Sequence, residues 1–177
     1  MKKSSKAYDQ YRKLFDQGSY LEAAHFAELE YLNGDPNNSF WLTRQAAALS
    51  RSGDYEEAFG KAKQALSLQP QNPYAVLAVA DALSGLGKIK EALSYYEEIA
   101  ADAKVSAPAR KSIFDGLTLL KDWDRILQLL GQWEMPPDKS FRWRVNALTG
   151  QNRLDEAIEI CHQWLRKSPG NPQGLWT

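Results

Sequence analysis

The chain repeats one short phrase at nearly constant spacing, and this repetition restricts its fold more than any other feature. Each copy places a turn residue, a large apolar residue two positions later, and a small or aliphatic residue three positions after that. The phrases end at Ala23, Ala58, Ala92, Ile126 and Ala157, between 31 and 35 residues apart. A period of about 20 to 50 residues is typical of stacked repeat units that share one core.

Each copy predicts two helices, because apolar residues recur at three- and four-residue spacing on both sides of the turn. In the second copy we expect helices over residues 39–51 and 55–68, joined at 52–54, where glycine reaches positive φ without a steric penalty. Proline ends the second helix, and Asn38, Asn72 or Asp138 is expected to cap the next one. No segment alternates at strand period, so we expect an all-α protein.

A helix pair of this length cannot bury its apolar face alone, so neighbouring pairs must stack. Alanine in the repeated phrase lets the helices approach closely. Large side chains are expected to fill the space between layers: Tyr20, Tyr55, Tyr96, Trp123, Trp133 and Trp164.

These phrases resemble the tetratricopeptide repeat family over residues 4–171. The second copy is the closest, with Tyr55, Ala58, Ala62, Ala65 and Pro70 at the family spacing. The resemblance implies one domain, a right-handed α-solenoid of about five helix-turn-helix repeats. We expect the repeats at 4–38, 39–72, 73–106, 107–137 and 138–171, followed by 172–177 as a further helix or tail. The fourth copy is short, which predicts an irregularity near 133–137.

The residues after Asn171 look like the opening of a sixth first helix, beginning at Pro172. Repeat arrays usually end in a polar capping helix. We therefore expect that the chain is part of a longer protein, or that a partner or a second copy covers its last face. A disordered tail is the alternative.

Composition excludes several classes of function. Lysine and arginine total 22, as do aspartate and glutamate, so the formal net charge is zero. Neither half is basic enough to predict a nucleic-acid partner. No apolar run approaches the ~18 residues of a membrane span, so no direct membrane insertion is expected. The only cysteine, Cys161, gives no sign of an oxidising compartment, and the cytoplasm is the default location.

The residues that bear chemistry do not form a convincing catalytic or metal site. Cys161 and His162 are adjacent and point in different directions on a helix, and the only other histidine is His25. We expect Cys161 to be a core thiol on a stripe with Ile158 and Leu165. Lys111, Asp115 and Cys161 are the best candidates for an enzyme, and we expect them in different helices. No enzyme activity, cofactor or metal is therefore predicted. The six tryptophans are assigned to packing, with a stacking platform for nucleic acid or sugar as the alternative.

In the tetratricopeptide family the first helix of each pair lines a concave face, and the resemblance implies the same here. Helical spacing then selects the partner-binding residues: Tyr8, Arg12, Thr43, Ala47, Leu77, Asp81, Lys111, Asp115, Arg142 and Asn146. This mixed set suits a helix or extended protein segment with an apolar strip. Thr43, Leu77 and Asp81 do not suit the clamp with which some members of the family hold a terminal carboxylate.

Three hypotheses follow. The chain is a non-catalytic, scaffold-like module for protein–protein interaction, or it has an assembly role as a homodimer joined through its C-terminal end, or it is an enzyme that uses Lys111, Asp115 and Cys161. The alternative to the binding groove is a spacer that binds nothing specific.

Overall fold

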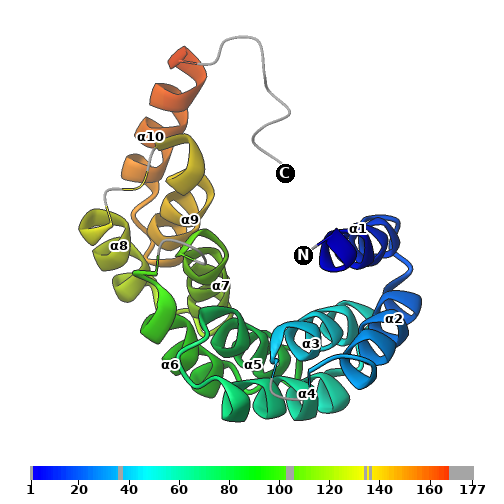
Figure 1. Ribbon diagram of the computed structural model, residues 1–177. Helices are drawn as coiled ribbons and strands as arrows, with labels where there is room; N and C mark the ends of the chain where they lie inside the picture. Colours follow the sequence, from blue (N-terminus) through cyan, green and yellow to red (C-terminus); the bar gives the residue numbers. More distant parts are fainter. Residues whose placement is uncertain (1, 36–37, 103–105, 134, 136, 168–177) are drawn as a thin grey trace. The chain divides into compact units, whose positions relative to one another are not determined.

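The structure is a computed structural model that describes residues 2–35, 38–102, 106–133, 135 and 137–167. Within these residues it contains helices and no strand, which confirms the predicted all-α class (Figure 1). None of these helices is both long enough and apolar enough to cross a bilayer. The helices are α1 (Lys2–Asp16), α2 (Tyr20–Leu32), α3 (Phe40–Ser52), α4 (Tyr55–Leu68), α5 (Pro73–Gly85), α6 (Ile89–Ile99), α7 (Ser106–Leu119), α8 (Trp123–Gln132), α9 (Pro137–Gly150) and α10 (Leu154–Lys167).

The helices form pairs, each with a first and a second helix around the repeated turn. The second helix of the second pair has the predicted bounds, and its first helix begins and ends one residue later than predicted. Asn72 caps α5 as predicted, because its side chain accepts a hydrogen bond from the Tyr74 N–H. Asn38 also accepts a hydrogen bond at the start of α3, from the Phe40 N–H at 2.9 Å, although Ser39 is the residue that immediately precedes this helix. Helix α9 begins at Pro137, so Asp138 lies inside it and is not its cap.

The chain divides into two compact units, residues 1–113 and 114–177, which are called the N-terminal and C-terminal units below. In the N-terminal unit each helix from α1 to α5 packs on the next, and α3 also contacts α5. Figure 1 shows α3 and α5 on one side of this unit and α4 and α6 on the other. The predicted single domain over 4–171 stays a prediction, as does the irregularity near 133–137. Residues 172–177 lie outside the described residues.

The repeated small residue is buried in every pair. Ala23 and Ala58 are 0 % exposed, Ala92 is 1 % exposed and Ile126 is 0 % exposed. A methyl group at this position lets two helix backbones approach closely. Close packing of this kind stabilises the fold through many dispersion contacts. The prediction that alanine sets the spacing between helices is consistent with this burial.

Two aromatic residues of the phrase lie against glycines of the following first helix. The Tyr55 ring occupies the space where Gly85 would carry a side chain, and the Trp123 ring does the same at Gly150. The contacts join α4 to α5 in the N-terminal unit and α8 to α9 in the C-terminal unit. A glycine at the end of the first helix therefore receives the aromatic ring of the second helix before it.

The turn between paired helices needs a left-handed backbone. Gly18, Gly53 and Gly87 supply it with φ of 80°, 96° and 76°. The fourth and fifth pairs use Lys121 and Asn152 at the same place, with φ of 56° and 60°. Residues other than glycine pay a steric penalty there, and asparagine pays less than most.

Replacing Gly85 or Gly150 with alanine should destabilise the protein, because the new methyl group would overlap the Tyr55 or Trp123 ring. We expect the free energy of unfolding to fall by about 1–3 kcal/mol in either variant. Chemical denaturation followed by circular dichroism measures the change.

Gly60→Ala is the matched control, because Gly60 lies inside α4 and has open space where a methyl group would be. This variant should gain about 0.5–1 kcal/mol from helix propensity. Equal effects of the same sign at Gly60 and Gly85 would contradict the packing described here.

Candidate functional site

The structure places all ten predicted partner-binding residues on first helices. Exposed members are Arg12, Asp81, Lys111, Arg142 and Asn146, and half-buried members are Tyr8, Ala47, Leu77 and Asp115. Thr43 is 4 % exposed, and its hydroxyl donates to the Phe40 carbonyl at 2.6 Å. Its side chain is therefore not accessible to a partner. Residues from Tyr8 to Lys111 belong to the N-terminal unit, and the last three belong to the C-terminal unit.

An arginine that the sequence analysis did not select lies at the centre of an aromatic cluster in the N-terminal unit. The guanidinium carbon of Arg44, on α3, lies 5.3 Å from the centroid of the Tyr8 ring and 4.9 Å from that of Phe40. The Tyr74 ring, on α5, is 5.6 Å away. These distances are typical of cation–π interactions. We call Arg44, Tyr8, Phe40 and Tyr74 the arginine cluster.

The guanidinium of Arg44 has donors that the protein does not use. Its Nε atom is buried and hydrogen-bonds to no described protein group. The residue as a whole is half-buried. A buried donor without a partner carries a free-energy cost. The aromatic rings therefore surround a cation that has one donor, Nε–H, without an acceptor among the described protein groups.

The positions of the cluster are held by neighbouring contacts. The Tyr11 hydroxyl donates to the Arg44 carbonyl at 2.8 Å, which ties α1 to α3. Burial, the largest cause, raises the pKa of Tyr11 well above its usual value, although the nearby Arg44 charge opposes this. Tyr11 therefore stays neutral and remains a donor at physiological pH.

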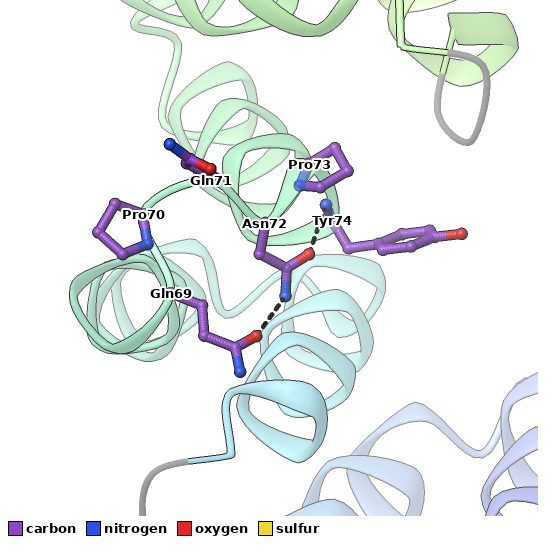
Figure 2. A pocket seen from close by; sticks show the side chains of 6 residues that line it. All are labelled: Gln69, Pro70, Gln71, Asn72, Pro73 and Tyr74. Carbon is purple, nitrogen blue, oxygen red and sulfur yellow. Dashed lines mark hydrogen bonds between the residues drawn. The ribbon is translucent and has the colours of Figure 1, made fainter.

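Tyr74 is positioned by the loop before α5. A depression of about 630 Å³ lies beside this loop. Figure 2 shows the side chains that line it: Gln69, Pro70, Gln71, Asn72, Pro73 and Tyr74. The Gln69 Oε1 atom accepts from the Ser39 hydroxyl at 2.7 Å and from Asn72 Nδ2 at 3.3 Å. These hydrogen bonds anchor the loop to α3 and fix the start of α5.

The sequence contained a signal for this cluster. Phe40 and Arg44 are four residues apart, so they share one face of a helix. Tyr74 follows Phe40 by one repeat length, at the start of the next first helix. Aromatic residues repeated around a cation on first helices were the pattern to search for.

Asp81 is exposed as a residue, but its carboxylate contacts the buried Tyr96 of α6. The Tyr96 hydroxyl donates to Asp81 Oδ1 at 2.6 Å. Partial burial raises the pKa of Asp81 above its usual value, while the Tyr96 hydrogen bond and the charges of Arg51 and Lys111 act in the opposite direction. Burial and the Asp81 charge together raise the pKa of Tyr96.

In the C-terminal unit two predicted residues bind each other. Arg142 Nη2 donates to Asp115 Oδ1 at 2.9 Å, and the indole N–H of Trp143 donates to the same oxygen at 3.1 Å. The Arg142 guanidinium also lies 5.2 Å from the Trp143 ring centroid. A partly exposed ion pair of this kind contributes about 0–1 kcal/mol to stability. Asn146 lies on the same helix, α9.

Charge in the N-terminal unit follows the class of helix. Among the side chains that the structure describes, its first helices carry more basic than acidic groups, and its second helices carry the reverse. On α1, α3, α5 and residues 106–113 the basic groups are Lys6, Arg12, Lys13, Arg44, Arg51, Arg110 and Lys111, and the acidic ones are Asp9, Asp16 and Asp81. On α2, α4 and α6 the acidic groups are Glu22, Glu28, Glu30, Glu56, Glu57, Glu91, Glu97 and Glu98, and the basic ones are Lys61, Lys63 and Lys90.

The expected core thiol is in a different environment from that predicted. Cys161 is half-buried on α10, where Ile158 is 52 % exposed and Leu165 is 39 % exposed. The stripe lies at the surface of the described part of the chain and does not form core. Lys111 and Asp115 also share α7, contrary to the expectation of separate helices. The described residues contain no cluster of three metal-ligating side chains.

Comparisons with known proteins support the repeat assignment. Residues 49–112 match the family described as tetratricopeptide repeat. The chain is 24 % identical over 162 residues to the DnaJ homolog subfamily C member 7 homolog of Schizosaccharomyces pombe, covering 91 % of this chain and 31 % of that protein. The chain thus spans about a third of its relative.

Solved structures share the fold. MamA from Desulfovibrio magneticus RS-1 matches with a TM-score of 0.76 and 18 % identity, over 98 % of this chain and 99 % of that one. The second domain of this repeat type in human RPAP3, in complex with the HSP70 peptide SGPTIEEVD, matches with a TM-score of 0.54 and 23 % identity, over 62 % of this chain and 91 % of that one. The predicted all-α solenoid is confirmed.

The variant Tyr96→Phe should raise the pKa of Asp81 further, because the phenolic hydrogen bond is one of the causes that lower it. A carboxyl group whose pKa is higher in the folded than in the unfolded state contributes most to the stability of the fold below its unfolded-state pKa. This contribution is lost as the pH rises through the folded-state pKa. The loss should therefore be larger in Tyr96→Phe. Carbon-detected NMR titration of Asp81 measures the shift, and a pKa of Asp81 that falls would contradict the hydrogen bond.

Proposed function

We propose that the chain, of which residues 49–112 match the tetratricopeptide repeat family, is a non-catalytic interaction module. Its partner is a protein segment, helical or extended, that binds on the first-helix face of the N-terminal unit. The longer Schizosaccharomyces pombe relative supports a place within a larger protein or complex. The proposal includes a scaffold role and a cytoplasmic location, the latter because the sequence, with one cysteine, offers no disulfide.

The observation that carries the proposal is the pattern of burial along α5. Its apolar residues Ala75, Val76 and Val79 are 3 % exposed or less, so they form the core of the unit. Tyr74 is 40 % exposed and Leu77 is half-buried on the same helix. A partner that covers Tyr74 and Leu77 gains free energy from removing their apolar surface from water.

The human RPAP3 domain supports a peptide as the form of the partner, since that domain is in complex with a short HSP70 peptide. The matched part covers 62 % of this chain. A groove with an apolar strip receives such segments through side chains on one face of a helix or on alternate positions of a strand.

The chemistry of the first-helix face favours contact over catalysis. Asp115 is engaged by Arg142 and Trp143, and Cys161 lies on α10 in the exposed stripe. A catalytic constellation needs a nucleophile and a base within hydrogen-bond reach. Asp115, one of the three enzyme candidates of the sequence, is instead engaged by an arginine and an indole N–H.

The variant Leu77→Glu should abolish capture of the partner, because it places a charge beside Tyr74 among the accessible apolar side chains of α5. Affinity capture from the source lysate, with the recovered protein identified by mass spectrometry, measures the loss. Leu32→Glu is the matched control, since Leu32 is 70 % exposed on the second helix α2. Equal recovery with a folded Leu77→Glu variant would contradict the proposal.

A second candidate function is self-association through α10. Leu154, Ile158 and Leu165 are exposed on α10, with Cys161 on the same stripe. The spacing of four, three and four residues places them on one face of the helix. A second copy is one way to cover this stripe.

Ile158→Lys should then keep the chain monomeric at concentrations where the wild type associates, because the charge opposes burial of the stripe. Light scattering across a concentration series measures the mass. Glu159→Lys, a charge change on the neighbouring exposed position, should leave the association unchanged. A wild type that stays monomeric throughout would remove this second function.

A further inference from the structure

Building on the proposed function, we propose that Arg44 is the anchor of the binding face and that it takes an acidic side chain from within the partner segment. The site is the arginine cluster, in which Tyr8, Phe40 and Tyr74 surround the guanidinium. The partner is therefore an acidic protein segment with apolar residues beside its carboxylate.

The first argument is the open hydrogen-bonding capacity of Arg44. A guanidinium carries five N–H donors in a planar fork that matches the two oxygens of a carboxylate. The Nε–H of Arg44 is buried and hydrogen-bonds to no described protein group. Removing a cation from water without pairing it costs free energy. A carboxylate that binds at the accessible side of the half-buried Arg44 pairs this charge.

The second argument is the fixed orientation of the guanidinium. Cation–π contacts to the three rings restrict the orientation of the half-buried guanidinium. The rings themselves are held in place: Tyr8 is stacked on Tyr11 with ring centroids 6.3 Å apart, and Tyr74 lies in the first turn of the helix that Asn72 caps. An anchor that is already ordered loses less conformational entropy when a ligand binds.

The third argument is charge. The first helices of the N-terminal unit are predominantly basic and the second helices predominantly acidic, as described above. The net charge of the whole chain is zero and so does not reveal this separation of charge by helix. The face that carries Arg44 therefore attracts an acidic segment, whereas the opposite face repels it, and both effects direct the encounter.

The arrangement of the rings favours a carboxylate inside the segment over one at its C-terminus. Tyr8 comes from α1 and Tyr74 from α5, so apolar surface flanks Arg44 in two directions. A segment that crosses the site places neighbouring residues on both flanks. A terminal carboxylate would place residues on only one of them.

A displayed library of short random segments tests the proposal. Each segment is fused to its carrier at both ends, so that it offers no terminal carboxylate, and binders to the full chain are selected. Selected segments should be rich in Asp or Glu next to aromatic or aliphatic residues. Their affinity for Arg44→Gln should fall about tenfold or more, as is typical of a lost charge-assisted pair.

Three further variants separate binding from folding. Lys63→Gln removes one positive charge from the second helix α4 and should bind as wild type. Arg44→Lys keeps the charge without the fork and should lose an intermediate part of the affinity. Tyr74→Leu should weaken binding while the melting temperature stays close to that of the wild type, since Tyr74 is 40 % exposed.

The outcomes distinguish this inference from the proposed function. Selected segments without acidic residues, or segments that bind folded Arg44→Gln as well as the wild type, overturn the role of Arg44 and leave a peptide-binding module. Segments that need a free C-terminal carboxylate, found when a second library displays one, overturn the internal site. A library that gives no binder at all counts against both proposals.

Discussion

The close approach of helices at small residues is the constraint on which the rest of the structure depends. Ala23, Ala58 and Ala92 are almost completely buried, and a larger side chain there would push the helix backbones apart. Gly85 and Gly150 serve the same purpose at the next interface, where they leave room for the rings of Tyr55 and Trp123. Small residues thus set the spacing, and aromatic residues fill what remains.

This division of labour leaves the first-helix face of the N-terminal unit available for recognition. Stability comes from the alanine and aromatic contacts between helices, so Arg44, Tyr74 and Leu77 are not required to complete the core. Arg44 instead lies among aromatic rings, and its buried Nε–H has no partner among the described protein groups. In the proposed function, the excess of basic groups on the first helices attracts an acidic partner before the two make contact.

The fold was largely predictable because its determinants are local and repeated. The turn phrase, the three- and four-residue apolar spacing and the helix-ending prolines gave the bounds of α4 and those of α3 within one residue. The turns at Lys121 and Asn152 show that the left-handed conformation persists where glycine is absent. One copy read alone would not reveal it, but alignment of the copies does.

The candidate site was less predictable because it depends on which side chains remain accessible. Helical spacing selected Thr43, whose hydroxyl turns back to its own helix, and passed over the adjacent Arg44. The mutual pairing of Asp115 and Arg142 also depends on contacts between helices that are far apart in the sequence. The sequence analysis compared the charges of the two halves of the chain. In the structure, basic groups prevail on the first helices of the N-terminal unit and acidic groups on its second helices.

The crystal structure of the chain in complex with an acidic segment that binds it tests the central claim most directly. The account predicts that the segment lies across α1, α3 and α5, with a side-chain carboxylate hydrogen-bonded to the guanidinium of Arg44. A segment bound along the second helices, or one whose carboxylate lies away from Arg44, would contradict it.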